Sequence, residues 1–148
     1  MTRKTPEKLS PYFLIQEFLR SEPWHLLCAV VMLNQTSAKQ VWKVWPVFHR
    51  LYRNPEDFLL ANEHEVLDLI KPLGFKSRRY ERLLGMTLGY LAGFTDVTTL
   101  YGIGKYGADS FRIFVEGYLV EDVLDKELKN YVAWAKEDNI TGAGDGND

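Results

Sequence analysis

The spacing of apolar residues predicts short helices along the whole chain. Apolar side chains recur every three or four positions, the spacing of a helix with one buried face, as in the series Val41, Val44, Trp45, Phe48, Leu51 and Tyr52. Residues 24–33 are apolar on nearly all sides, which is typical of a fully buried helix. Because no pair of segments carries a β-hairpin signal, we predict one all-α domain of about eight or nine short helices.

Polar and turn-forming residues set the predicted boundaries of the helices. Ser10 before Pro11 predicts an N-cap and the start of the first helix, and the last helix is predicted to end near Glu137. The domain is expected to span residues 10–138, followed by a disordered acidic tail over the Gly- and Asp-rich residues 139–148. Gly85 and Gly89 weaken the helix predicted over 77–92 unless they serve close packing.

The distribution of charge changes the meaning of the formal net charge of −2, which at first sight argues against nucleic-acid binding. Residues 1–115 hold 15 Lys and Arg against 11 Asp and Glu, whereas residues 116–148 hold 3 against 9. Residues 71–82 form a basic cluster with a single acidic residue, Glu81. The body of the chain is therefore mildly basic and its end acidic, a pattern that fits either a solvated face or a surface for DNA.

Length and cysteine content exclude several classes of protein. A chain of 148 residues suits one domain that buries a core without metal or disulfide. The single cysteine, Cys28, excludes an intramolecular disulfide framework and favours a reduced intracellular compartment. No apolar run reaches the roughly 18–20 residues of a membrane span, and the polar start lacks the features of a secretory signal. Because His25, His49 and His64 share no metal-like spacing, no metal site is predicted.

The strongest local motif is the segment 100–106, Leu-Tyr-Gly-Ile-Gly-Lys-Tyr. Its two glycines favour a sharp turn between helices, because glycine adopts positive φ and lets another backbone approach. A helix that begins directly after Gly104 presents unpaired backbone amides, which bind anions such as phosphate, and Lys105 adds a positive charge. A Gly-x-Gly pair alone would fit an ordinary helix–helix turn equally well.

Several separated motifs together resemble the helix-hairpin-helix DNA glycosylase superfamily, and within it the glycosylase domain of methyl-CpG-binding mismatch-repair glycosylases. The resemblance covers about residues 10–138, and it implies a helical fold in two lobes flanking a cleft. The matching motifs are Glu22-Pro23-Trp24, Leu33-Asn34 with Thr36-Ser37, Lys71-Pro72-Leu73-Gly74, the segment 100–106, Asp109-Ser110, Arg112-Ile113-Phe114, and Asp125 about twenty residues after the hairpin.

The resemblance implies a catalytic role for Asp125 and Tyr106. A carboxylate beneath the sugar stabilises the positive charge that develops as the N-glycosidic bond breaks; the alternative for Asp125 is an N-cap of the last helix. Tyr106 occupies the position where lyase-competent relatives carry a lysine that forms a Schiff base. A phenol cannot form one, which predicts a monofunctional enzyme with Tyr106 lining the base pocket; the alternative for Tyr106 is a core aromatic.

Three further residues are implied in the base pocket. Gln16 matches a glutamine that reads the flipped pyrimidine through its amide, although periodicity alone would leave it on the surface. Leu33 would pack on the base, with an ordinary core position as the alternative. Glu127 stands where the relatives have a lysine, a departure that reverses the charge beside Asp125.

The DNA contacts are implied in the same way. Gln35, in place of an arginine, would fill the gap left by the flipped nucleotide, and Phe75, in place of a leucine, would wedge between bases. The predicted backbone contacts are Lys76, Arg78, Gly102, Gly104 and Lys105. Cluster-bearing members have four C-terminal cysteines that this chain lacks, so no iron–sulfur cluster is expected; hairpin carbonyls in the superfamily can bind a monovalent cation.

The sequence therefore predicts a monofunctional DNA glycosylase of base excision repair that removes thymine or uracil mispaired with guanine. It is expected to flip the base out of double-stranded DNA, and to act as a nuclear monomer without cofactor or membrane. Three alternatives stay open: a non-catalytic DNA-binding module with the same fold, a glycosylase for another lesion such as mismatched adenine or an alkylated base, and a plain helical interaction domain, which would show no salt-dependent DNA affinity.

Overall fold

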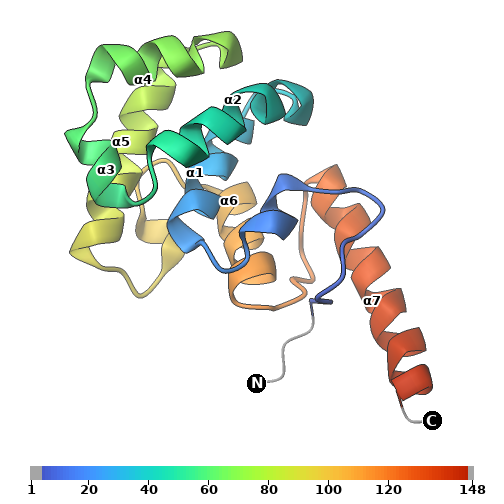
Figure 1. The fold of residues 1–148 in the computed structure, drawn as a ribbon. Coiled ribbons are helices and arrows are strands. Elements are labelled where there is room, and N and C mark those ends of the chain that lie inside the picture. The colour runs from blue at the N-terminus through green and yellow to red at the C-terminus, as the bar shows by residue number, and fades with distance from the viewer. Residues whose placement is uncertain (1–4, 147–148) are drawn as a thin grey trace.

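All regular structure is helical in residues 5–146, the part of the chain that the computed structural model describes (Figure 1). The predicted all-α class is confirmed, with seven α-helices in these residues rather than about eight or nine. Four shorter segments are 3₁₀- or π-helical. The order along the chain is η1 (Ile15–Leu19), α1 (Pro23–Leu33), α2 (Ala38–Leu51), α3 (Pro55–Leu60), α4 (Glu63–Ile70), η2 (Lys71–Leu73), α5 (Lys76–Ala92), η3 (Val97–Thr99), α6 (Lys105–Ser110), η4 (Phe111–Val115, π) and α7 (Lys126–Gly146).

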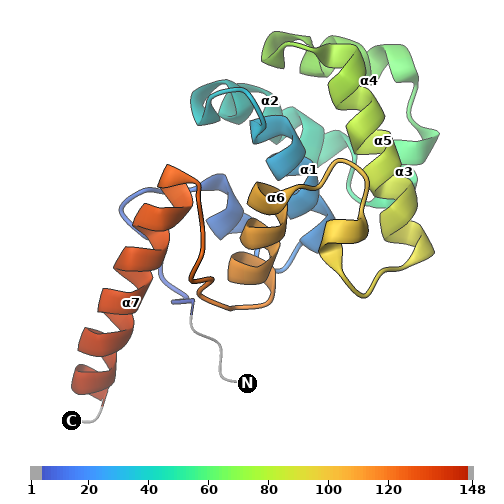
Figure 2. The same ribbon diagram turned by 180° about the vertical axis from the view of Figure 1, so that it is seen from behind.

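Helix α1 is the centre of the core. Its residues from Trp24 to Met32 are all buried, as the continuous apolar run predicts. It contacts α2 and α5 on one side and α6 on the other (Figures 1 and 2). Trp24 Nε1 donates a hydrogen bond to Thr87 Oγ1 of α5 at 3.0 Å, which satisfies the indole N–H inside the core. Helices α2, α5 and α6 are thus arranged around α1.

The two glycines of α5 serve close packing, the alternative that the sequence leaves open to a weakened helix. A Cβ atom at Gly85 would lie 2.4 Å from Tyr101 Cδ1, and one at Gly89 would lie 3.0 Å from Leu100 Cδ2. Tyr101 and Leu100 begin the segment 100–106, so the missing side chains let this turn lie directly on α5. The glycines that weaken the helix therefore position the hairpin.

The N-terminal segment differs from the prediction. Ser10 does not cap a helix: its backbone N–H and its hydroxyl both donate to the carboxylate of Glu17 at 2.7 Å. The Leu14 amide donates to the same carboxylate at 2.7 Å. Buried Glu17 thereby folds residues 10–14 back on themselves, and only the short 3₁₀ segment η1 follows.

The C-terminal helix is longer than predicted. Helix α7 continues to Gly146, so the predicted end near Glu137 is wrong. The disordered tail over residues 139–148 stays a prediction. Residues 147 and 148 of the predicted tail lie outside the described residues. Figures 1 and 2 show α7 extending beyond the other helices. Among the described residues, no helix combines the length and the apolar character needed to cross a lipid bilayer.

Candidate active site

A pocket of about 540 Å³ lies where four parts of the chain meet. The N-terminal segment, the loop between α1 and α2, and the beginnings of α6 and α7 each contribute a wall. Six residues that the sequence places in the site line it, and these are Gln16, Leu33, Gln35, Tyr106, Asp125 and Glu127. Its other lining residues are Tyr12, Phe13, Leu14, Ile15, Asn34, Thr36, Ser37, Ala38 and Trp42.

Gln16 and Tyr106 meet in the wall of the pocket. The side-chain nitrogen of Gln16 donates to the Tyr106 hydroxyl at 2.8 Å and to Ser110 Oγ at 3.3 Å. Gln16 is 2% exposed, so periodicity, which predicts a surface position, fails here. Burial, followed by the negative charge of Asp125, raises the pKa of Tyr106 well above its usual value. The phenol therefore keeps its proton at neutral pH and is a hydrogen-bonding group.

Asp125 makes the N-cap interaction of α7 and also lines the pocket, while its catalytic role stays a prediction. Its Oδ2 accepts the backbone N–H of Leu128 at 2.9 Å, which is the N-cap interaction at the start of α7. The same half-buried residue lines the pocket, together with the exposed Glu127. The cap fixes the carboxylate at the helix N-terminus, where the helix dipole favours negative charge.

Left-handed backbone occurs at two residues that line the pocket, Phe13 and Gln35, and at Phe75, which lies outside it. Among the described residues, the non-glycine positions with positive φ are Phe13 (49°), Gln35 (61°) and Phe75 (48°). This conformation is unfavourable for L-residues and persists where surrounding contacts impose it, often at functional sites. Phe13 lines the pocket and is 58% exposed, and the sequence carries no signal for it, because its backbone angle follows from the fold around Glu17.

Arg79 is a positioning residue that the sequence does not reveal. Its side chain is buried, and burial lowers its pKa. The guanidinium donates at 2.8–3.2 Å to five backbone carbonyls, those of Val31, Met32, Asn34, Leu73 and Gly74. Several of these lie at the C-terminal end of α1, where the helix dipole favours a cation. One side chain therefore holds both the loop with Gln35 and the turn before Phe75.

Phe75, the predicted wedge, lies outside the pocket that Asp125 lines. Phe75 is 70% exposed and follows Gly74, whose φ is 82°. With Lys76 and Arg78 it borders a shallow depression of about 490 Å³. The structure thus groups Phe75 with two basic residues on one surface and keeps this surface separate from Asp125.

The hairpin has the predicted turn but a partly neutralised lysine. Gly102 has a φ of 82°, and α6 begins after Gly104 without a side-chain cap. Lys105 Nζ lies 3.0 Å from Asp109 and 3.4 Å from the exposed Asp122. The hydrogen bond to Asp109 raises the pKa of Lys105, which stays charged. Two carboxylates therefore partly neutralise the charge of Lys105 and would compete with a DNA phosphate for it.

The site offers no thiolate cluster for a metal. Cys28 is the single cysteine of the sequence, it is buried in α1, and burial raises its pKa well above its usual value. An iron–sulfur cluster needs several thiolates, which these residues do not supply.

Comparison with known proteins agrees with this architecture. Residues 28–143 match the profile of the HhH-GPD superfamily of base excision DNA repair proteins. A methyl-CpG-binding domain protein 4-like protein of Arabidopsis thaliana is 36% identical over 121 residues, covering 78% of this chain and 27% of that protein. A thymine-DNA glycosylase of Aeropyrum pernix is 41% identical over 116 residues, covering 73% of this chain and 52% of that protein. An adenine DNA glycosylase of Mycobacterium tuberculosis is 31% identical over 121 residues, covering 76% and 39%.

Solved structures share the fold. A thermostable thymine-DNA glycosylase aligns with a TM-score of 0.60 at 24% identity, covering 66% of this chain and 49% of that chain. Endonuclease III in a non-covalent DNA complex aligns with a TM-score of 0.61 at 20% identity, covering 73% and 54%. The chain spans about a quarter of the Arabidopsis relative and about half of the Aeropyrum relative. Because the superfamily profile covers most of its length, the chain belongs to the HhH-GPD superfamily of base excision DNA repair proteins.

Proposed function

We propose that this chain is a monofunctional DNA glycosylase that removes thymine or uracil mispaired with guanine. The observation that carries the proposal is the convergence of Gln16, Tyr106 and Asp125 on one pocket of about 540 Å³. The similarity to the thymine-DNA glycosylase of Aeropyrum pernix supports the same class of reaction. The polar groups of the pocket are those that base recognition and sugar chemistry require.

Gln16 supplies the group that would select the base. Its Nε2 donates to the hydroxyls of Tyr106 and Ser110, so both amide hydrogens are engaged and the carbonyl Oε1 is left to accept. The N3–H of thymine and uracil is a donor, whereas N3 of cytosine and N1 of adenine carry lone pairs. A carbonyl oxygen here favours thymine or uracil, because it would leave the other bases with unpaired acceptors.

Asp125 supplies negative charge where the sugar becomes positive. When the N-glycosidic bond breaks, the electron pair leaves with the base and positive charge develops at C1′, which a nearby carboxylate stabilises. Oδ2 is held by the Leu128 amide, so Oδ1 can orient and deprotonate a water molecule. The water oxygen bonds to C1′, and an abasic site remains.

Tyr106 favours hydrolysis without strand cleavage. A lyase needs an amine that attacks the sugar and forms a Schiff base, and a half-buried phenol with a raised pKa offers neither an amine nor a phenolate. The neighbouring Lys105 is held 3.0 Å from Asp109. The reaction would therefore stop at the abasic site.

Access to the pocket requires base flipping, since the glycosidic bond is otherwise inside the duplex. Gln35 would fill the space left in the helix, and Phe75 would part the stack beside Lys76 and Arg78. The hairpin would hold backbone phosphate on the amides of α6. A monovalent cation at the hairpin carbonyls, the domain limits of 10–138, a monomeric state and a nuclear location remain predictions.

The test uses end-labelled duplexes with one T·G or U·G mispair, incubated with the protein and then treated with alkali. The wild type is expected to give strand breaks only after alkali, and borohydride should trap no covalent complex. Asp125→Asn keeps an equally good N-cap but removes the charge, so we expect at least about a 100-fold loss in rate without loss of Tm.

Each further outcome of this assay selects another function. No base release by the wild type, or an equal rate for Asp125→Asn, overturns the proposal. Duplex binding without release would identify a non-catalytic binding module. Preferential release of mismatched adenine would follow the Mycobacterium relative instead.

A further inference from the structure

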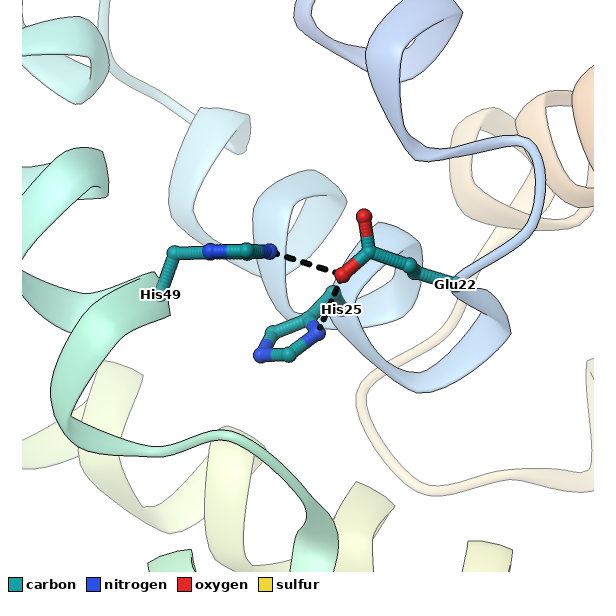
Figure 3. Close-up of side chains that lie close together, drawn as sticks. All are labelled: Glu22, His25 and His49. Atoms are coloured by element: carbon teal, nitrogen blue, oxygen red, sulfur yellow. Dashed lines mark hydrogen bonds and ion pairs between the residues drawn. The ribbon is translucent and has the colours of Figure 1, made fainter.

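Three side chains outside the pocket form a second polar cluster. Glu22, which precedes α1, lies between His25 of α1 and His49 near the end of α2 (Figure 3). Glu22 Oε1 is 3.2 Å from His25 Nδ1 and 2.7 Å from His49 Nε2. All three ligand-type atoms lie within 4.8 Å of one another. The fold thus brings together two histidines that sequence spacing treats as unrelated.

The hydrogen bond on the far side of His25 fixes its tautomer. His25 Nε2 lies 2.7 Å from the carbonyl oxygen of Tyr52, which can only accept, so Nε2 carries the hydrogen. A neutral ring with its hydrogen on Nε2 has a lone pair on Nδ1, the ring atom next to Glu22 (Figure 3). The lone pair faces the carboxylate of Glu22, so two acceptors meet at 3.2 Å. A cation between them removes that conflict.

The surroundings match those of a metal-binding histidine. A ligating histidine commonly donates its other N–H to a backbone carbonyl, which orients the ring, as His25 does toward Tyr52. The indole rings of Trp24 and Trp45 lie 4.9 Å and 5.8 Å from the His25 ring and limit its movement. The side chains of Glu22 and His49 are 36% and 40% exposed, which leaves an open side for a water ligand and for entry of an ion.

The distances suit a small tetrahedral ion after a modest adjustment. Zinc ligands at about 2.0–2.1 Å from the metal lie about 3.3 Å from one another. The Glu22–His25 distance is already 3.2 Å, whereas the 2.7 Å between Glu22 and His49 must widen. His49 is half-exposed and can move outward. Its Nε2 proton is replaced by the metal, and the ring can carry a proton on Nδ1 instead.

We propose that Glu22, His25 and His49 form a binding site for a divalent transition-metal ion of the zinc type. The site joins the beginning of α1 to the end of α2, whereas the pocket lies at the opposite end of α1. Two histidines, one carboxylate and one open position form a ligand set that zinc accepts. The ion would stabilise the folded chain without taking part in base removal, so the proposal does not depend on the proposed activity.

The test titrates the metal-free chain of 148 residues with Zn²⁺ by calorimetry and records Tm, and it uses Co²⁺ absorption to report tetrahedral nitrogen and oxygen ligation. We expect one equivalent bound, and a Tm rise of about 5–10 °C at 100-fold excess over Kd. His49→Gln and Glu22→Gln should each remove the binding and the Tm rise.

His64→Gln is the matched control, because His64 is an exposed histidine on α4 outside the cluster. It should bind one equivalent like the wild type. The metal-free Tm of His49→Gln should equal that of the metal-free wild type, which separates loss of the ion from misfolding. Unchanged Tm with Zn²⁺ in the wild type, or equal binding by His49→Gln and the wild type, overturns the proposal and leaves a plain hydrogen-bonded cluster.

Discussion

Arg78 and Arg79 are neighbours on α5 with opposite surroundings. Arg78 is exposed at the depression beside Phe75, whereas Arg79 is buried and bonded to five carbonyls. Both belong to the same basic cluster of the sequence. The structure assigns one to the surface that would meet DNA and the other to the support beneath it.

This contrast predicts that substitution by methionine lowers stability at Arg79 and weakens DNA binding at Arg78. Arg79→Met leaves several buried carbonyls unpaired, each worth roughly 1–3 kcal/mol, so we expect the free energy of unfolding to fall by more than about 3 kcal/mol in urea titrations. Arg78→Met should change it by less than about 0.5 kcal/mol. Instead it should reduce the slope of log Kd against log salt by about 0.9 for the lost phosphate contact. Equal stability losses in the two variants would refute the assignment.

Sequence reasoning locates the site residues that belong to a recognisable motif. It misses residues whose role depends only on contacts with the backbone. Gln16, Tyr106 and Asp125 are found through the resemblance, and they do line one pocket. Arg79 is missed because its acceptors are carbonyls, which every residue possesses. Phe13 is missed because left-handed backbone is expected at glycine or asparagine, and its φ of 49° is not expected for phenylalanine.

At the scale of elements, the two hairpin glycines have different reasons to be glycine. Gly102 has a φ of 82°, which L-residues rarely adopt. Gly104 has φ −98° and ψ −159°, extended backbone open to any residue, and a Cβ there would meet nothing within 4 Å. The free protein therefore does not need glycine at 104, whereas a ligand that approached the α6 amides would need the space above it.

Gly104→Ser is expected to separate folding from DNA binding. Serine is a better N-cap than glycine, so Tm should be unchanged or slightly raised. Its side chain would occupy the space over the amides, and the Kd for duplex DNA should rise by about tenfold or more, equivalent to one lost charge-assisted hydrogen bond of roughly 1.5–3 kcal/mol. Fluorescence anisotropy measures the Kd; an unchanged value would show that phosphate does not approach here.

The pattern of apolar residues predicts the buried helices better than the termini. The apolar run 24–33 correctly predicts a buried helix, and the glycines of α5 are explained by close packing. The start near Ser10 is wrong, since Glu17 is buried and competes for the amides that a helix would use. The predicted end of the last helix is wrong as well. The glycines at 142, 144 and 146 predict coil, but α7 continues through them.

At the scale of the whole molecule, carboxylates offset the basic surface at a specific place. Lys105 lies at the hairpin but is paired with Asp109, whose side chain is buried, and with Asp122, which is exposed. Part of the negative charge of the chain therefore offsets the positive charge of Lys105 by direct ion pairing. Composition alone reveals the acidic end of the chain, and only the fold shows which cation it reaches.

Asp122→Asn should strengthen DNA binding by freeing Lys105 for phosphate. We expect a lower Kd at low salt and a slope of log Kd against log salt that increases by up to about 0.9. Asp68→Asn, an exposed change of equal charge on α4, is the matched control. If both variants gain equally, the effect is one of total charge, and the Lys105 pair has no specific role.

A rigid pair of loops changes how such a protein would sample a long duplex. The hydrogen bonds of Arg79 hold the backbone of two segments, residues 31–34 and residues 73–74, before any DNA is present. Ordering a free loop on contact would cost roughly 1–2 kcal/mol for each residue fixed. Here that entropy is lost once, when the chain folds. The dwell time at each base pair would then depend on how readily that base pair opens. The protein would stay longer at a mispair, because a mispair opens more easily than a matched pair.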